Sequence, residues 1–169
     1  MTWPLDWREV AVFDANTAAL GVEVLELMTA AGEALVEQAV SMAAEGEYLI
    51  LCGPGNNGGD GFAMALALAE YEIEVRLVTS HKEQKGEAAQ SFRARCEAAG
   101  AKVEVWSKDS EFGTPVRLVD CLSEAGAGGK PRGQVAKILE WSRRADPDLV
   151  LACDVPAGIG TIFLLPADV

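Results

Sequence analysis

The sequence predicts an α/β fold in which a doubly wound, mostly parallel β-sheet is covered by helices on both faces. Two observations lead to this prediction. Short continuous apolar runs, of which YLILC at residues 48–52 is the clearest, alternate with longer segments whose apolar residues recur at helical spacing. A glycine-rich segment, GPGNNGGDG at residues 53–61, separates that first run from an alanine-rich helical segment. Strands that alternate with helices are joined by right-handed crossovers and form a parallel sheet between two helical layers.

The individual elements follow in a regular order along the chain. Residues 8–45 have helical spacing, and Gly21 separates two helices there. The apolar run at 48–52 is typical of a central parallel strand buried on both faces. We expect further helices at residues 62–71, 85–99 and 133–144, and further strands at residues 74–79, 102–106, 116–121 and 149–153. If the first strand is central, the chain winds out through the second and third strands and returns through the fourth and fifth, which opens a crevice between the first and fourth.

Composition limits the kinds of protein this chain can be. With 169 residues, half of them hydrophobic and 24% charged, it can bury one core, so we expect a single domain over residues 1–169. The net charge of −12 argues against a nucleic-acid or anionic-membrane partner, because such partners require a basic surface. No apolar stretch reaches the roughly 20 residues of a membrane span, and the N-terminus lacks a signal segment. The sequence therefore predicts a cytoplasmic protein without a membrane partner.

Cysteine and histidine usage excludes several catalytic classes. The four cysteines, Cys52, Cys96, Cys121 and Cys153, form no CxxC pair, and His81 is the only histidine. This argues against structural zinc and against Ser-His-Asp or Cys-His catalysis. Three of the cysteines end predicted strands, so we expect buried structural thiols, with a reactive thiol as the alternative.

The glycine-rich segment is the first candidate binding element. Five of its nine residues are glycine, which predicts a backbone that takes positive φ values or approaches a ligand closely. Backbone N–H groups and the dipole of the following helix favour an anion such as phosphate, and Asn56 and Asn57 add amide groups. The alternative is a plain glycine turn in which Asp60 caps the helix.

Two common nucleotide-binding motifs fit this segment poorly. Gly53, Gly55 and Gly58 formally match GxGxxG, but the second predicted strand ends in TSH at 79–81, without an acid to bind a ribose 2′-hydroxyl. The Lys-Ser/Thr ending of a nucleoside-triphosphate loop is also missing, which disfavours a kinase or ATPase.

Asp120 and Asp154 are the candidate acidic residues, each at the C-terminal end of a predicted strand, where doubly wound folds bind ligands. Two acids beside an anionic ligand are explained by a monovalent cation or by proton transfer. The alternative is that Asp120 caps a helix or a turn, and that Asp154 belongs to a simple turn before Pro-Ala-Gly.

Together these motifs resemble the NAD(P)H-hydrate epimerase family in order and spacing. The resemblance rests on GPGNNGGDGFA at 53–63, on Asp120 ahead of Gly126 and PRG at 131–133, and on DVPAG at 154–158. Residues 15–40, especially Leu27-Met28 and Ala31-Gly32, also resemble the family's opening helices, so the likeness covers nearly the whole chain. It implies a Rossmann-like, three-layer αβα fold.

The resemblance also implies an activity, namely repair of hydrated NADH or NADPH (NADHX and NADPHX) by interconversion of the R and S forms at ring carbon 6. The S form then passes to a separate dehydratase. The implied substrate-binding residues are Asn56, Asn57, Gly58, Gly59, Asp60, Glu124, Ala125, Gly126, Ala127, Gly128, Gly129, Lys130 and Asp154. The implied ligands of a potassium ion are Asn57, Asp120 and Ala157. A homodimer is compatible with the resemblance.

Asp154 is the candidate catalytic residue. Inverting ring carbon 6 requires a bond there to break and re-form, through loss of the hydroxyl or opening of the ring, and either route needs a group that gives and takes a proton. His81 lies after the second predicted strand, and Lys130 is the only lysine in the three loops, so a carboxylate is the available group. Asp120 is the better candidate to neutralise a cation, which would keep it ionised and a poor acid.

Three departures from the family pattern keep alternatives open. Position 157 is alanine instead of a serine, Glu124-Ala125 replaces Gly-Thr, and residues 166–169 resemble the start of the family's next strand, so we expect a truncated C-terminal end. The first two departures favour a catalytically inactive nucleotide-binding or scaffolding module of the same fold. A third interpretation, an NAD-dependent dehydrogenase, rests only on the loose GxGxxG match.

Overall fold

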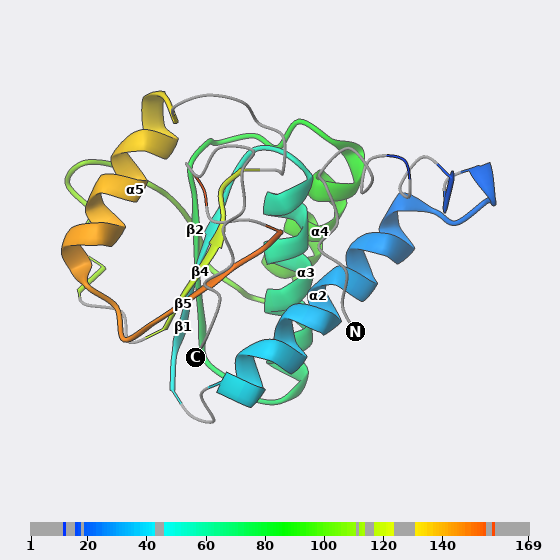
Figure 1. Ribbon diagram of the computed structural model, residues 1–169, viewed down its shortest axis with the longest axis horizontal. Coiled ribbons are helices and arrows are strands. Elements are labelled where there is room, and N and C mark those ends of the chain that lie inside the picture. Colours follow the sequence, from blue (N-terminus) through cyan, green and yellow to red (C-terminus); the bar gives the residue numbers. More distant parts are fainter. Residues whose placement is uncertain are drawn as a thin grey trace, which may run out of the picture.

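The computed structural model describes residues 12, 16–17, 19–42, 46–110, 112–113, 117–123, 131–154 and 157 (Figure 1). Its elements in chain order are α2 (Val24–Met42), β1 (Tyr48–Cys52), α3 (Asn56–Glu70), β2 (Val75–Thr79), α4 (Glu87–Ala98), β3 (Val103–Val105), β4 (Arg117–Cys121), α5 (Gly133–Ala145) and β5 (Leu149–Ala152). Every predicted strand is confirmed to within a few residues. Gly21, with φ of 86°, lies in a turn before α2, as the predicted break between two helices requires.

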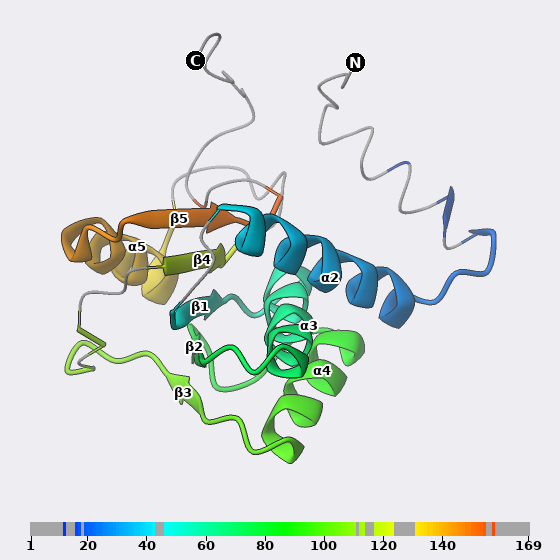
Figure 2. The same ribbon diagram turned by 90° about the horizontal axis from the view of Figure 1, so that it is seen from below.

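The strands form one parallel sheet in the order β3-β2-β1-β4-β5. Figure 2 shows the five strands in that succession. β1 is central, and the chain winds outward through β2 and β3 before it returns through β4 and β5, as the sequence predicted. The C-terminal ends of β1 and β4 therefore lie where the winding direction reverses, which is the usual ligand position in such sheets.

Helices cover both faces of the sheet, which confirms the three-layer αβα prediction. In Figure 1, α2, α3 and α4 lie on one face and α5 lies on the other. Successive side chains of β1 point to opposite faces of the sheet, which explains this arrangement. Tyr48, Ile50 and Cys52 pack with α2, α3 and α4, whereas Leu49 and Leu51 pack with α5. All five β1 residues are buried, as expected of a central parallel strand.

Helix α3 begins at Asn56, whereas the sequence predicted a start at residue 62, so most of the supposed loop is helix. Its N-cap is Gly55, with φ of −98°, and Asp60 lies in the second turn, so the alternative in which Asp60 caps the helix is wrong. The sequence predicted that the glycine-rich segment takes positive φ values or approaches a ligand closely. The first does not occur, since the described glycines with positive φ all lie elsewhere in the chain, and the second stays a prediction.

Close packing explains the glycines instead. A Cβ atom at Gly58 would lie 2.0 Å from the carbonyl oxygen of Gly53, and one at Gly59 would lie 2.4 Å from Met28 Sδ. A Cβ atom at Gly61 would lie 3.0 Å from Cys52 Sγ. These approaches bring α3 against α2 and against the edge of the sheet. The packing contacts that these close approaches allow outweigh the low helix propensity of glycine. That low propensity is why the sequence predicted a later helix start.

All four cysteines are free and buried, as expected of structural thiols. Among the helices of the described residues, none combines the length and the apolar character that a membrane span requires.

Candidate functional site

Three segments meet at the C-terminal edge of the sheet and build the candidate site. They are the turn and first turns of α3 after β1, the residues after β4, and the residues after β5. Backbone hydrogen bonds also join the residues that follow β1 and β5 to the end of β4, with Gly53 N donating to Cys121 O at 2.8 Å and Cys153 N donating to Asp120 O at 2.9 Å. The backbone therefore holds the predicted site residues on these segments side by side.

Asn57 ties the three segments together from inside α3. Its side chain is 3% exposed, and Nδ2 donates to Ser123 O at 2.7 Å and to Cys153 O at 3.3 Å. One amide thus satisfies backbone carbonyls of both neighbouring loops. This fixes the loops after β4 and β5 relative to the start of α3, a role that the spacing of the motifs did not predict.

Asp120 is buried at the end of β4, with 5% of its surface exposed. Oδ1 accepts a hydrogen bond from Leu122 N at 3.1 Å, and Oδ2 accepts one from Ala157 N at 2.8 Å. Burial raises the pKa of this carboxyl, and the two amide donors partly oppose that rise. Asp120 therefore acts as a turn-stabilising residue, as in the alternative above, and it also brings Ala157 into the site.

Asp154 follows β5 and is exposed, with φ of 57°. Positive φ is unfavourable for residues other than glycine, although aspartate tolerates it better than most. The other described non-glycine residues with positive φ lie at helix ends, since Glu72 is the second residue after α3 and Asp146 directly follows α5. Asp154 instead takes this conformation at a strand end beside Asn57, and such backbone strain is often found at functional sites.

Asp60 and three buried cysteines lie close to the residue that precedes Asp154. Cys52 pairs with Cys121 across β1 and β4, and Cys153, which directly follows β5, belongs to the same buried cluster. Cys153 Sγ lies 3.7 Å from Asp60 Oδ2, which brings this predicted substrate-binding residue of α3 close to the neighbour of Asp154. Burial raises the pKa of Cys52, and a hydrogen bond with Cys153, together with burial, raises the pKa of Cys121. Protonated buried thiols are poor nucleophiles, so these residues have a packing role.

The start of α3 is suited to bind an anion. Gly55 provides no side-chain cap, and Gly59 N is bonded to Gly55 O at 3.2 Å. The N–H groups of a first helical turn have no acceptor within the helix and carry a partial positive charge. Asn56, exposed at the first position, and Gly58 lie in this turn, at the place where the sequence predicted phosphate binding.

Polar residues at the end of β2 also border this element. The sequence indicated only that this position lacks an acidic residue and predicted no role for them. Thr79, Ser80 and Gln84 are all buried. Ser80 N donates to Cys52 O at 2.9 Å, and Lys85 N donates to Pro54 O at 2.8 Å. The connection from β2 to α4 therefore lies against the turn before α3. The signal in the sequence was a run of polar residues directly after an apolar strand.

Part of the predicted site lies outside the described residues, namely Glu124, Ala125, Gly126, Ala127, Gly128, Gly129 and Lys130. Within the described part of the chain, no group of three or more His, Cys, Asp or Glu side chains is arranged to hold a metal ion.

The chain matches the family model described as YjeF-related protein N-terminus over residues 24–162. It is 38% identical over 138 residues to an NAD(P)H-hydrate epimerase of Rhodopirellula baltica, covering 79% of this chain and 56% of that protein. It is 33% identical over 146 residues to the bifunctional NAD(P)H-hydrate repair enzyme Nnr of Escherichia coli, covering 83% of this chain and 27% of that protein. The chain thus spans little more than half the length of one relative and about a quarter of the other.

A solved structure is similar in fold. The crystal structure of yeast ynu0 superposes with a TM-score of 0.83 and 17% identity, covering 92% of this chain and 71% of that one. This likeness supports the Rossmann-like arrangement of sheet and helices.

Proposed function

Because the chain belongs to the family of YjeF-related protein N-terminal domains, we propose that it is an NAD(P)H-hydrate epimerase that interconverts the R and S forms of hydrated NADH and NADPH. The observation that supports this most is the position of Asp154. Its carboxylate is exposed at positive φ, in a loop whose Cys153 carbonyl accepts a hydrogen bond from Asn57 at the start of α3. An acid and an anion-binding helix start thereby face the same edge of the sheet.

Substrate binding begins at the start of α3. The pyrophosphate of the hydrated dinucleotide lies against the first-turn N–H groups, with Asn56 beside it, because this is where a chain with a net charge of −12 offers local positive potential. Binding here directs the damaged ring toward the loops after β4 and β5.

Asp154 transfers the proton. Inversion at ring carbon 6 proceeds through departure and return of the hydroxyl or through opening and closing of the ring, and in both routes a proton is given in one step and taken back in the other. Asp120 is unsuited to this work, because each of its oxygens accepts a backbone N–H and the side chain is buried. Asn57 holds the Asp154 loop in position while the proton moves.

A potassium ion bound at Asn57, Asp120 and the backbone at Ala157 belongs to the same proposal. The residues fit such an ion in part, since Asp120 is a buried carboxylate and Asn57 an amide that reaches both loops. Ala157 has no side-chain oxygen, so a backbone carbonyl or water would have to replace it. The ion would supply positive charge next to the anionic substrate and would favour the ionised form of Asp120.

The product and the setting follow from this activity. The S form would pass to an NAD(P)H-hydrate dehydratase, and relatives named bifunctional repair enzymes make such coupling reasonable. We also propose that the protein is cytoplasmic and forms a homodimer. Light scattering of the purified protein tests the dimer.

The direct test supplies the R form together with an excess of S-specific dehydratase. If the chain is an epimerase, adding it restores the NAD(P)H absorbance that the dehydratase alone cannot recover. An unchanged rate of recovery with and without the chain contradicts the proposed activity.

The second candidate is a nucleotide-binding module of the same fold without epimerase activity. One observation favours it, since Ala157 lies where a side-chain oxygen would complete the cation site, yet only its backbone N contacts Asp120. In that case, NADHX or ADP-ribose stabilises the fold while the coupled assay shows no turnover. A ligand at about a hundredfold its dissociation constant should add roughly 2.7 kcal/mol to the free energy of unfolding.

A further inference from the structure

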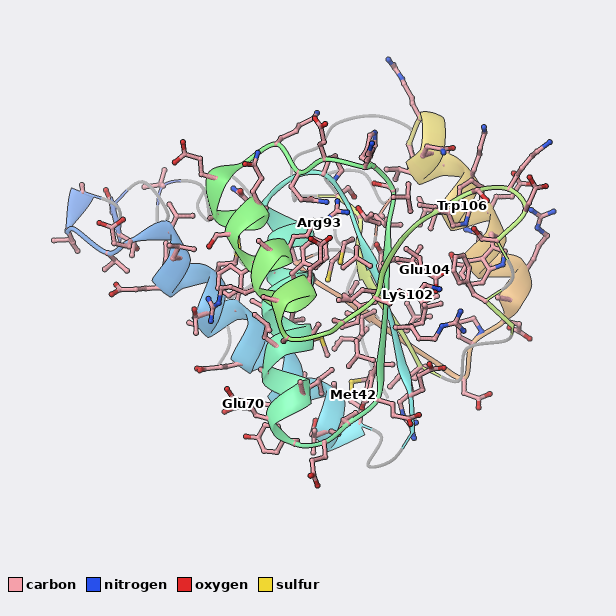
Figure 3. All side chains as sticks on the ribbon, turned by 180° about the vertical axis from the view of Figure 1, so that it is seen from behind. Met42, Glu70, Arg93, Lys102, Glu104 and Trp106 are labelled. Carbon is pink, nitrogen blue, oxygen red and sulfur yellow. The ribbon has the colours of Figure 1, made fainter. Side chains whose placement is uncertain are left out.

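A second pocket lies beside the proposed substrate site, on the β2 side of the sheet. It is open and has a volume of about 340 Å³. Lys82, Glu83 and Gln84 line it from the connection between β2 and α4, and Gln90, Arg93 and Glu97 line it from α4. Figure 3 shows Arg93 extending from α4 toward the edge of the sheet where that connection runs.

Gln84, one of the residues that line this pocket, carries a buried hydrogen-bond acceptor, its Oε1, that no described residue pairs with. The residue is 4% exposed, and its Nε2 donates to Thr79 Oγ1 at 3.1 Å. Among the residues that the structure describes, none donates to its Oε1. Exchanging the two ends of the amide would not help, because Thr79 Oγ1 already donates to His81 O and needs a donor from Gln84. Buried acceptors are rarely left unpaired, so a donor from a ligand is expected here.

The connection between β2 and α4, which lines this pocket, lies on the side of the proposed site opposite Asp154. The connection that carries Gln84 is fixed to the turn before α3 by the hydrogen bond from Lys85 N to Pro54 O. Asp154 lies at the end of β5, which is separated from β2 by β4 and β1. Three strand spacings make about 14 Å. A ligand that reaches from Asp154 to Gln84 must therefore be extended, with its anionic middle at the start of α3.

We propose that this pocket binds the adenosine half of the hydrated dinucleotide, with Gln84 Oε1 accepting a hydrogen bond from the ribose 2′-hydroxyl. The inference rests on the proposed epimerase function. In doubly wound dinucleotide sites, an acid near the end of the second strand usually accepts that bond, and here TSH at 79–81 provides none. Gln84 offers the acceptor oxygen a few residues further along the same connection.

The charges around the pocket favour the substrate without a 2′-phosphate. Arg93 Nη1 donates to Lys82 O, and Arg93 Nε pairs with Glu97 Oε1 at 3.0 Å, so the guanidinium is already engaged. Gln84 Oε1 has no proton to donate to a phosphate, and the Lys82 ammonium and Glu83 carboxylate that line the same pocket offset each other, so no surplus positive charge is left for a 2′-phosphate. The site therefore prefers NADHX to NADPHX.

The test compares binding of ADP-ribose and of 2′-phospho-ADP-ribose to three variants by calorimetry. Gln84→Met keeps the length of the side chain and removes the acceptor, so the dissociation constant of ADP-ribose should rise about tenfold, the loss of one hydrogen bond to substrate. KM for NADHX should rise similarly while kcat stays within about twofold, as for a contact made equally in the ground and transition states. Gln38→Met, on the exposed side of α2, is the matched control and should change neither value.

Gln84→Glu separates ligand contact from a purely structural role. It retains an acceptor and adds negative charge, so ADP-ribose binding should survive while the 2′-phosphorylated ligand loses at least a further tenfold. The pocket assignment is overturned if wild type fails to bind ADP-ribose, if it binds the 2′-phosphorylated form more tightly, or if Gln84→Met binds as wild type does. If ADP-ribose binding depends on Gln84 but the protein shows no turnover, the pocket assignment stands and the epimerase function is refuted. If the protein shows turnover but the Gln84 variants bind and turn over substrate as wild type does, the epimerase function stands and the pocket assignment is refuted.

Discussion

Asn57→Ala is the substitution that most directly tests how the site is held together. It removes an amide whose Nδ2 donates to Ser123 O and Cys153 O in a position that is 3% exposed. Alanine has a higher helix propensity than asparagine, so α3 itself should not be weakened. The effect therefore reports the two contacts to the loops after β4 and β5.

The expected loss of stability follows from those contacts. A typical hydrogen bond contributes about 1 kcal/mol net, and a buried group left without its partner costs about 1–3 kcal/mol. Water can reach part of the space left by the side chain, so we expect a loss of about 2–4 kcal/mol in total. A native domain has a free energy of unfolding of roughly 5–15 kcal/mol, so the variant should still fold.

Urea unfolding of Asn57→Ala and Asn56→Ala measures this difference. Asn56 precedes Asn57 in the same helical turn but is exposed, so its replacement should change the free energy of unfolding by less than about 0.5 kcal/mol. Asn57→Ala should also lower kcat, because the loop that carries Asp154 loses its tie to α3. If both variants unfold at the same urea concentration, Asn57 does not hold the loops and this description of the site is wrong.

Three further predictions concern packing, thiols and the cation. Gly58→Ala should prevent folding or severely destabilise the folded protein, since the new Cβ atom would lie 2.0 Å from Gly53 O. Gly86→Ala is the control and should fold, since its Cβ atom would meet only Asn56 Oδ1 at 3.3 Å. Equal melting temperatures for the two variants would contradict the packing role of Gly58. At about pH 8 a thiol reagent should label none of the four cysteines in the folded protein and all four in urea. Burial raises the pKa of Cys96 to about 12. The free energy of unfolding should therefore fall as the pH rises from about 9, where the thiols of the unfolded chain ionise, toward 12. Rapid labelling of the folded protein would count against buried thiols. Replacing sodium by potassium should increase ligand affinity, and Ala157→Ser should increase that response; equal affinities in both salts, for both proteins, would exclude a specific ion.

The sheet could be predicted from the sequence because its signals are local. Each strand is a short apolar run, and the run at 48–52 is apolar on both faces, which only a central parallel strand requires. Strand order then followed from the handedness and winding rules for such folds. The positions of Asp120 and Asp154 at strand ends followed from the same pattern.

The start of α3 and the contacts of the site could not be predicted, because they depend on tertiary packing. Glycine disfavours helices in isolation, and only the closeness of Met28 and Gly53 explains why Gly58 and Gly59 are helical. The bonds of Asn57 to Ser123 and Cys153 span more than sixty residues of sequence. Such contacts leave no periodic signal in one sequence.

The proposed function depends on a proton exchanged between Asp154 and the substrate, and Asp154→Asn in the coupled epimerase assay tests this step. Asparagine tolerates the φ of 57° at least as well as aspartate does, so the loop should keep its conformation while the proton chemistry is lost. Turnover should fall by about 10²–10⁴-fold, while ADP-ribose binding should change by less than about threefold. Turnover within a few-fold of wild type would contradict this prediction and would make Asp154 a binding residue only.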